Sequence, residues 1–380
     1  MKFLFAGDFY PNTEKAKRII DDRQYMSVMK DTVPYIKESD FSIVNFESPI
    51  ANPDKQQPFI KKGPRNLCSS KNAMECVKET GFSMIALANN HFHDYGDVGV
   101  RQTIEACNEF EIPFCGAGMT LLEAQTPKMV AIDGKIISVI NYCENEFSVA
   151  TSSSAGANPF NLVDIVHQIN SIRSKSDYVL VFVHGGVEHY QLPTPMMVKN
   201  YRFLIEMGAD IVVNSHQHCF NGYEIYQGKP IVYGLGNFFF DNGSTTVTQW
   251  NEGYMAMIEE KDNQYTVTAI PYLQGMDNMT ISVLEDSQAF NQRLATINEI
   301  IQNPKKIACE FDSYVNKNYR TLLSYFEPYT SRVALKLYRM GIFPSLLSKK
   351  KRVLLLNRIR CESHQLVYSK VLSQSLNFPF

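Results

Sequence analysis

Two histidines, His216 and His218, follow directly after a β-branched apolar run at residues 211–213. Such a run is typical of a buried parallel strand, and ligands of open α/β sheets gather at the carboxyl ends of these strands. Neutral imidazoles two residues apart at such an end can bind Zn, Fe, Ni or Cu. Two surface histidines on a loop are the alternative, so a metal site requires ligands at other strand ends.

Four more apolar runs end in residues that commonly bind metals. These residues are Asp8 after 3–6, Glu47 after 41–46, Asn89, Asn90 and His91 after 84–88, and His184 after 178–183. One such ending carries little information, but five in a chain of alternating strands and helices predict one shared site at a sheet edge. Carboxylate, amide and imidazole ligands together suit a divalent ion such as Mn, Fe, Zn or Co.

A site of this composition can hold one or two ions, and the carboxylate of Glu47 could bridge two. Two ions roughly 3.5–4 Å apart stabilise the attacking and leaving oxygens of a phosphoester displacement and lower the pKa of bound water. A histidine just outside the metals can protonate the leaving group. We expect His91 in that role, because the preceding Asn90 would be the ligand, and Asp94 could orient His91.

Structural roles are the alternatives for the same residues. Asp8 could cap the following turn, and Asn89 and Asn90 are common in turns with positive φ. His184 could be a hydrogen-bonded core histidine. Glu188 could be part of the polar surface.

The elements that must position these residues follow an α/β pattern through residue 272. Helices are expected at 21–37 (broken or kinked at Pro34), 70–80, 98–110, 162–174 and 194–207, and hairpins at 129–142 and 254–271. From about residue 286 the pattern is helical throughout. We therefore predict a site-bearing domain at residues 1–285 and a basic helical extension at 286–380.

Charge is divided unevenly in a chain whose formal net charge is only −2. From Ser331 onward ten Lys and Arg face a single acidic residue, Glu362, which leaves 27 basic and 38 acidic residues before it. The run at 349–356 joins four basic residues to Val-Leu-Leu-Leu. A solvated face, an anionic membrane surface and a partner protein are the alternatives for this tail. No nucleic-acid motif is present, so nucleic acid is not expected as a partner.

The eight cysteines include no CxxC pair and suggest a reducing compartment. The amino-terminal residues lack the architecture of a signal peptide, and no stretch is long and apolar enough to span a bilayer. We expect a cytoplasmic protein, peripheral at the inner face of the membrane if the tail binds there.

Six motifs in order resemble the CapA-type poly-gamma-glutamate capsule proteins, a family of the calcineurin-like metallophosphoesterase superfamily. They are Gly7-Asp8, Asn45-Phe46-Glu47, Ala88-Asn89-Asn90-His91 with Asp94-Tyr95-Gly96, His184-Gly185-Gly186-Val187-Glu188, Ser215-His216-Gln217-His218 and Tyr233-Gly234-Leu235-Gly236-Asn237-Phe238. The resemblance implies a four-layer α/β/β/α sandwich, with a C-terminal helical extension beyond it. It places metal ligands at Asp8, Glu47, Asn90, His184, His216 and His218, the general acid at His91, and substrate-binding residues at Asn89, Glu188 and Asn237.

Three departures from the phosphoesterase pattern bear on the site. The Asp-x-His motif ends here in Tyr10, so one imidazole ligand is missing, and the bridging position is Glu47 rather than Asp. Gly185 stands where the family has Trp, which leaves room beside the site. These departures leave open whether one ion or two are bound.

The resemblance implies a metal-dependent hydrolase of phosphoesterase type in capsule or cell-envelope polymer synthesis, with poly-gamma-glutamate or a polysaccharide as the polymer. The cofactor would be one or two ions of Mn, Fe or Zn, and the substrate an anionic polymer or a phosphoester. The alternative is a non-catalytic, metal-containing accessory protein of a polymer synthesis or export complex. A peptidase or amidase acting with the same metals is a third hypothesis.

Overall fold

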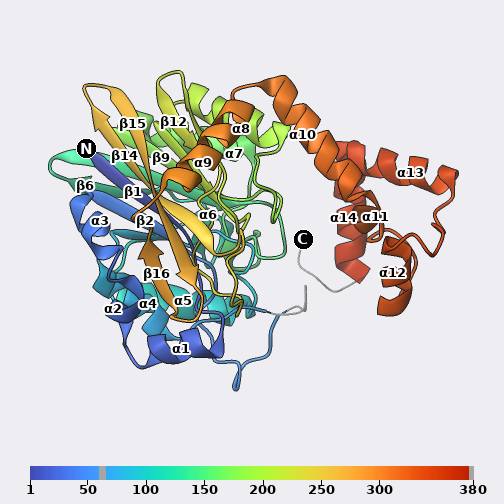
Figure 1. Ribbon diagram of the computed structural model, residues 1–380, viewed down its shortest axis with the longest axis horizontal. Helices are drawn as coiled ribbons and strands as arrows, with labels where there is room; N and C mark the ends of the chain where they lie inside the picture. Colours follow the sequence, from blue (N-terminus) through green and yellow to red (C-terminus); the bar gives the residue numbers. More distant parts are fainter. Residues whose placement is uncertain (60–65, 376–380) are drawn as a thin grey trace. The chain divides into compact units, whose positions relative to one another are not determined.

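The computed structural model describes residues 1–59 and 66–375 and divides into two compact units, Met1–Pro304 and Lys305–Phe380 (Figure 1). The first unit is a mixed α/β structure, which confirms the predicted fold class at that level. It includes α9 (Gln288–Ile301), whereas the sequence-based boundary after residue 285 assigned this helix to the extension. Phe290 and Leu294 explain its position, because both are buried in the hydrophobic core of the first unit.

The larger sheet has eight strands in the order β16-β15-β14-β1-β2-β3-β4, with β13 also paired to β1. β1, β2, β3 and β4 run parallel, and β14 is antiparallel to β1. The bounds are β1 Lys2–Phe9, β2 Phe41–Phe46, β3 Met84–Ala86, β4 Phe114–Cys115, β13 Asn237–Phe239, β14 Glu252–Lys261, β15 Gln264–Gly275 and β16 Thr280–Val283.

The second sheet has six strands in the order β11-β12-β10-β9-β7-β6. Its central strands β7, β9, β10 and β12 run parallel, and β6 and β11 are antiparallel edge strands. The bounds are β6 Lys128–Ile132, β7 Lys135–Cys143, β9 Tyr178–His184, β10 Ile211–Ser215, β11 Tyr223–Tyr226 and β12 Lys229–Val232, and a separate small pair joins β5 Ala117–Gly118 to β8 Gly156–Ala157.

The two sheets share one hydrophobic core. Because side chains alternate along a strand, Phe3 and Phe5 of β1 join the cluster that contains Phe182 and Val213 of the second sheet. The neighbouring Leu4 instead joins the core beneath the helices. Each face of β1 is therefore buried, which is why its residues 3–6 form an uninterrupted apolar run.

Helices cover the outer faces of the sheets. Side chains of α1, α2, α4 and α5 belong to the core on the outer face of the larger sheet, and α7 and α8 contact β7, β9, β10 and β12. The bounds are α1 Glu14–Asp21, α2 Tyr25–Met29, α3 Val33–Glu38, α4 Lys71–Thr80, α5 Gly96–Glu109, α6 Leu121–Ala124, α7 Leu162–Arg173 and α8 Pro195–Glu206. The helix expected at 21–37 is two short helices, and Pro34 occupies the first turn of α3, where proline is tolerated.

A close backbone approach joins β13 to β1. A Cβ atom on Gly7 would lie 1.9 Å from the carbonyl oxygen of Gly236, and Gly236 itself has φ +79°. Glycine is the residue that accepts both conditions. The approach sets Asp8 opposite Asn237 in the parallel register, so two residues far apart in the sequence become neighbours at the sheet edge.

The second unit is helical in the part that the structure describes. Its helices are α10 Pro304–Lys317, α11 Tyr319–Leu323, α12 Arg332–Arg339, α13 Lys349–Arg360 and α14 Glu362–Ser375. No helix within residues 1–59 and 66–375 has the length and apolar character needed to cross a membrane.

Candidate metal centre

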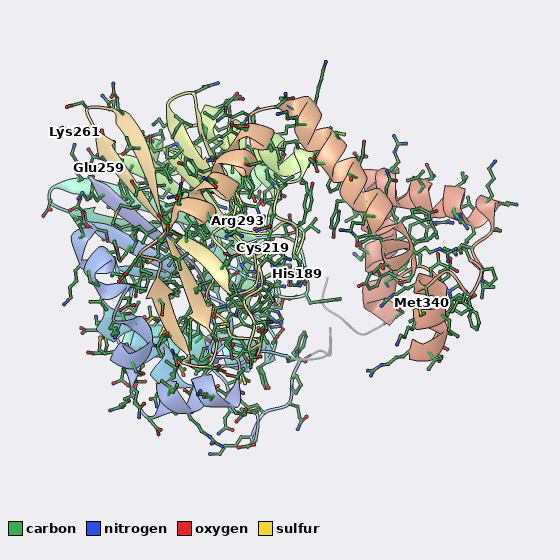
Figure 2. The ribbon with its side chains drawn as sticks, viewed as in Figure 1. His189, Cys219, Glu259, Lys261, Arg293 and Met340 are labelled. Carbon is green, nitrogen blue, oxygen red and sulfur yellow. The ribbon has the colours of Figure 1, made fainter. Side chains whose placement is uncertain are left out.

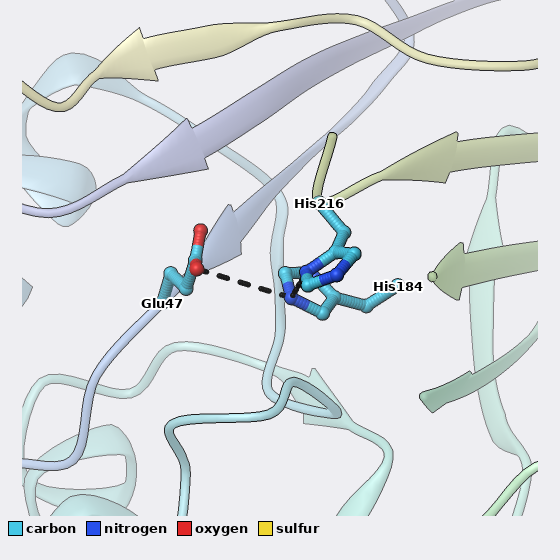
Figure 3. A group of neighbouring side chains, drawn as sticks. All are labelled: Glu47, His184 and His216. Atoms are coloured by element: carbon cyan, nitrogen blue, oxygen red, sulfur yellow. Dashed lines mark hydrogen bonds and ion pairs between the residues drawn. The ribbon is translucent and has the colours of Figure 1, made fainter. Parts of the chain in front are cut away.

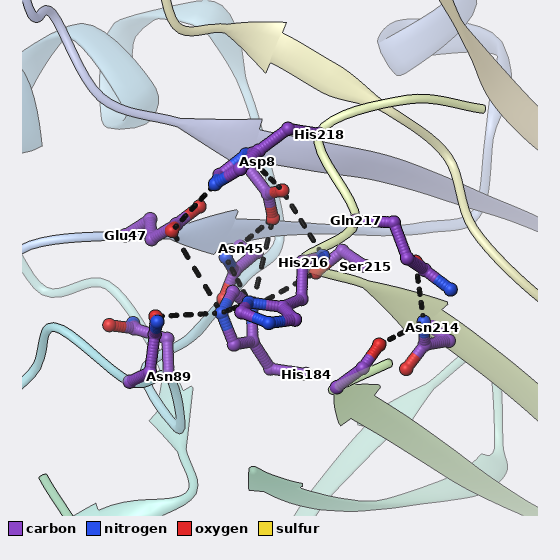
Figure 4. A network of polar contacts seen from close by, with 12 residues as sticks. Asp8, Asn45, Glu47, Asn89, His184, Asn214, Ser215, His216, Gln217 and His218 are labelled. Atoms are coloured by element: carbon purple, nitrogen blue, oxygen red, sulfur yellow. Dashed lines mark hydrogen bonds and ion pairs between the residues drawn. The ribbon is translucent and has the colours of Figure 1, made fainter. Parts of the chain in front are cut away.

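Strands from both sheets end at one buried site. Asp8 lies at the end of β1, Glu47 directly follows β2, and His184 ends β9. Asn90, His216 and His218 lie on the loops after β3 and β10, and all six side chains are buried. Figure 4 shows the carboxylates of Asp8 and Glu47 directed toward the three imidazoles. The residues expected to bind metal therefore lie together.

Glu47, His184 and His216 form the first group of potential ligands (Figure 3). His216 Nδ1 lies 3.0 Å from His184 Nε2, and His184 Nε2 lies 3.9 Å from Glu47 Oε1. Asn90 Oδ1 also lies 3.1 Å from His184 Nε2. Four potential ligand atoms from four strand ends thus surround one small volume.

Asp8, Glu47 and His218 form the second group, which shares Glu47 with the first. His218 Nδ1 lies 3.6 Å from Asp8 Oδ2, and His218 Nε2 lies 3.8 Å from Glu47 Oε1. Within each group the ligand atoms lie within 4.8 Å of one another. A carboxylate common to both groups is in the position that a bridging ligand would need.

The donor set fits a borderline divalent ion. Nitrogen and oxygen ligands about 2.1 Å from one Zn²⁺ ion lie about 3.4 Å from one another in a tetrahedron, which is close to the separations in both groups. Two buried carboxylates are costly without a compensating positive charge, and a bound cation would supply that charge. The buried Glu47, His184 and His216, and likewise Asp8, Glu47 and His218, could therefore hold an ion.

Burial shifts the proton affinity of two of these residues. It raises the pKa of Asp8 from 3.8 to about 6, although hydrogen bonds from Ser215, Asn45 and the His216 amide oppose this change. It lowers the pKa of His218 from 6.5 to about 4, partly offset by the charge of Glu188. His218 is therefore neutral at neutral pH, which leaves a nitrogen lone pair available as a ligand.

The loop after β10 is strained at the two histidines. His216 has φ +107° and His218 has φ +56°, in a region that non-glycine residues rarely adopt. Asn214 anchors the loop by donating to the carbonyl oxygen of Gly185 and to Gln217 Oε1, both at 2.9 Å. Such strain is common at functional sites, where the surrounding structure maintains it.

Two asparagines orient the ligand side chains. Asn237 Oδ1 lies 2.9 Å from His218 Nδ1 and accepts a hydrogen bond from it when that nitrogen is protonated. The other ring nitrogen, Nε2, is then directed toward Glu47. Asn45 Nδ2 lies 2.8 Å from Asp8 Oδ1 and 3.2 Å from His184 Nδ1. The sequence predicted that Asn237 binds substrate, and it predicted no role for Asn45. Asn45 begins the Asn-Phe-Glu motif quoted for the family, and its position two residues before Glu47 was the signal that could have identified it as a neighbour of the ligands.

His91 and Asp94 form a pair beside the centre. His91 Nδ1 lies 2.7 Å from Asp94 Oδ2, which also accepts the amide of Leu67 at 2.8 Å. Asp94 is fully buried, whereas the His91 ring is partly exposed. His91 directly follows Asn90, whose Oδ1 lies 3.1 Å from His184 Nε2, so the loop after β3 brings the pair next to the centre. This geometry suits a histidine oriented by a carboxylate.

The other predicted site residues take different positions. Asn89 Nδ2 donates to the carbonyl oxygens of Phe46 and Leu87, and its Oδ1 accepts the His91 amide, so it shapes the loop. Glu188 is on the exposed surface, near enough to influence His218. The substrate role expected for both residues stays a prediction.

Aromatic residues line the side of the centre around His218. Tyr10 is buried and packs edge-on against Phe240 with ring centroids 5.0 Å apart. Phe240 in turn packs on His218 at 5.1 Å, and the Trp250 ring lies 4.6 Å from His218. The sequence-based search missed Trp250, because nothing near position 250 marks it as a neighbour of His218.

The space left at Gly185 is occupied by Glu144. A Cβ atom on Gly185 would lie 2.7 Å from Glu144 Cγ. Burial raises the pKa of Glu144, and a hydrogen bond from the Gly186 amide opposes this change. The expected free room beside the site is therefore partly filled by a carboxylate side chain.

The sequence of the chain is similar to those of known bacterial proteins. Residues 2–242 match the family model described as "Bacterial capsule synthesis protein PGA_cap". The "Capsule biosynthesis protein CapA" of Bacillus anthracis is 28% identical over 276 residues, and the "PGA biosynthesis protein CapA" of Bacillus subtilis (strain 168) is 26% identical over 244 residues. These matches cover 70% and 63% of this chain, and 66% and 63% of the relatives, which is under two thirds of their lengths.

More distant similarities also exist. A "Probable polyglutamine synthesis accessory protein" of Mycobacterium tuberculosis is 29% identical over 169 residues, which cover 41% of this chain and 44% of that protein. A crystal structure of a hypothetical protein from Thermus thermophilus aligns over 72% of this chain and 100% of that chain, with 13% identity and a TM-score of 0.44. The family match covers well over half of the sequence, and the chain belongs to the bacterial capsule synthesis protein family PGA_cap.

Proposed function

We propose that the chain is a metal-dependent hydrolase of phosphoesterase type. The observation that carries the proposal is the pair of buried ligand groups that share Glu47. A carboxylate common to two groups is typical of centres that clamp a phosphoester between two ions. The layered packing of the two sheets supports a four-layer α/β/β/α sandwich of metallophosphoesterase type as the fold.

The residues of the chain have separate tasks in this proposal. When bound, the ions would polarise a phosphoryl oxygen and acidify water. Asn45 and Asn237 hold Asp8 and His218 in their ligand orientations. Asp94 holds His91 through Nδ1, so Nε2 is the nitrogen that donates a proton to the leaving oxygen.

The biological setting is the synthesis of a capsule or cell-envelope polymer. Membership of the family and the names of the Bacillus relatives support this setting. Poly-gamma-glutamate and an anionic polysaccharide both satisfy it. The substrate would be the anionic polymer itself or a phosphoester that arises in its synthesis.

The test is turnover by the full chain loaded with Mn²⁺, on bis(p-nitrophenyl) phosphate and on a gamma-glutamyl anilide. We expect phosphodiester hydrolysis, with kcat reduced about 10²- to 10⁴-fold in His91→Gln while the bound metal stays unchanged. Exposed His167 provides a matched control, His167→Gln, which should retain full activity. If only the anilide is hydrolysed, the proposal of a phosphoesterase is replaced by that of an amidase. If neither substrate is hydrolysed, the proposal of a hydrolase is refuted.

The second candidate is a non-catalytic accessory protein that binds an anionic polymer through its metal. Tyr10 favours it, because this residue stands where an imidazole ligand is expected. The name of the Mycobacterium tuberculosis relative is also that of an accessory protein. In this case His91→Gln would leave both metal content and polymer binding unchanged, with no turnover in the wild type.

A further inference from the structure

We propose that the C-terminal unit docks on the surface of an anionic lipid bilayer through its last three helices, α12, α13 and α14. These are called the terminal helices below. The inference goes beyond the proposed function, because it concerns where the chain works rather than what its centre does. It rests on residues of the second unit alone.

The terminal helices and the segments that join them expose apolar side chains at nearly every turn. These side chains are Val333, Met340, Ile342, Leu346, Val353, Leu354, Leu356, Ile359, Leu366, Val367, Tyr368, Val371 and Leu372. Several are more than half exposed, such as Met340 at 64%, which Figure 2 labels. Single exposed apolar residues are ordinary, but this many in 40 residues indicate a surface that another apolar phase covers.

The same surface is strongly basic. Ten Lys and Arg but only one acidic residue, Glu362, occur from Ser331 onward. On α13 four consecutive basic residues, 349–352, precede the apolar run, and Arg358 and Arg360 follow it. Lys and Arg beside exposed leucines can extend to lipid headgroups while their stems lie along the acyl boundary.

Exposed apolar side chains occupy more than one side of α14. Val367, Tyr368, Val371 and Leu372 lie near one another on the helix surface, and exposed Leu366 extends this apolar surface to the adjoining side. Exposed Tyr319 of α11, and exposed Tyr325 and Phe326 in the turn after it, add the aromatic rings that favour the headgroup region. Because no described helix can cross a membrane, the expected mode is surface binding.

Charge decides between a membrane and a second copy of the chain. The rest of the sequence is acidic, with 38 acidic against 27 basic residues, so a neighbouring chain could attract the basic residues. The apolar surface that a second copy offers is its own terminal helices, and these carry the same excess of ten Lys and Arg over one acidic residue, so the two surfaces repel each other. A bilayer supplies both negative charge and a deformable apolar phase.

The test is co-sedimentation of the full chain with vesicles of pure phosphatidylcholine or with about one third phosphatidylglycerol. We expect binding to the anionic vesicles, weakened at least about tenfold by 0.5 M salt or by replacing Lys349, Lys350, Lys351 and Arg352 with Gln. Leu354→Ser with Leu356→Ser should weaken binding at constant charge. All six side chains are exposed, with Leu354 at 41% and Leu356 at 54%, so the fold should tolerate their replacement.

The matched control replaces four exposed lysines of the first unit, Lys30, Lys55, Lys175 and Lys261, with Gln. It removes the same charge and should leave vesicle binding unchanged. Equal binding by the terminal-helix variant and the wild type would overturn the proposal, as would equal binding to both kinds of vesicle. If the chain binds no vesicles but self-associates, and the terminal-helix variant abolishes this self-association, the partner of the terminal helices is a second copy of the chain.

Discussion

Replacing Asp8 with Asn should stabilise the metal-free protein at neutral pH while removing a metal ligand. Asp8 is fully buried, and burial raises its pKa from 3.8 to about 6. A group whose pKa is raised in the folded state contributes stability below its unfolded pKa, and this contribution is lost as the pH rises through the folded pKa. Ionised Asp8 therefore costs the fold about 3 kcal/mol above pH 6.

The substitution removes this cost but creates a smaller one. An Asn side chain at position 8 can still accept the hydrogen bond from Asn45 Nδ2, which lies 2.8 Å from Asp8 Oδ1. Its amide group would then face the His216 amide, which donates to Asp8 Oδ2 at 3.2 Å. Two opposed donors cost about 1 kcal/mol. The net gain is about 2 kcal/mol near pH 7.5, and it changes to a loss of about 0.5 kcal/mol near pH 4, where the carboxyl is already partly ionised in the unfolded state.

The assay is urea unfolding of chelator-treated protein at these two pH values. Trp250 is the only tryptophan of the chain and lies 4.6 Å from His218, so its fluorescence reports the unit that contains the centre. His218→Gln is the matched control with the opposite sign. The pKa of His218 is lowered from 6.5 to about 4, so wild-type stability from this group is present above pH 6.5 and lost toward pH 4. A stability difference for Asp8→Asn that is the same at both pH values would refute the reasoning.

Three further substitutions test the supporting residues. Asn237→Ala should lower Mn²⁺ affinity about 10- to 100-fold in calorimetric titrations, because His218 loses the partner that orients it. Unchanged affinity would show that Asn237 does not support the ligands of the centre. Gly7→Ala should lower the free energy of unfolding by about 4 kcal/mol or more, or prevent folding, because its Cβ would clash with the oxygen of Gly236. A loss below about 1 kcal/mol in urea unfolding would contradict the close approach of β1 and β13. Tyr10→His should raise the number of bound Mn²⁺ ions, measured by elemental analysis after dialysis, since it would place an imidazole where the phosphoesterase pattern has one. An unchanged ion number would show that Tyr10 does not limit the centre.

Much of the site could be predicted because it lies at strand ends. An apolar run followed by Asp8, Glu47 or His184 locates both a buried strand and the polar residue at its carboxyl end. Parallel strands place such residues at one edge, whatever the remaining details of the fold. The helix expected at 70–80 is present as α4, which ends at Gly81 in the left-handed conformation.

The remaining features depend on contacts between distant segments. The pairing of β13 with β1 brings Asn237 opposite Asp8, and no local pattern encodes that register. Asn45 binds two ligand residues from different strands, so its role follows only from the assembled site. No local pattern assigns α9 to the first unit, because its apolar residues pack on a core formed by much earlier residues, including Phe220.

The central claim is that one buried centre at the sheet edge holds divalent metal, and elemental analysis of chain purified without chelator tests it most directly. Wild type, Glu47→Ala, His216→Ala and the exposed-histidine control His167→Ala would be compared. We predict one to two equivalents of Mn, Fe or Zn in the wild type and the control, and loss in both centre variants, with the largest loss in Glu47→Ala because both ligand groups share that carboxylate. Wild-type protein without metal even after soaking, or metal content unaffected by Glu47→Ala, would contradict the account.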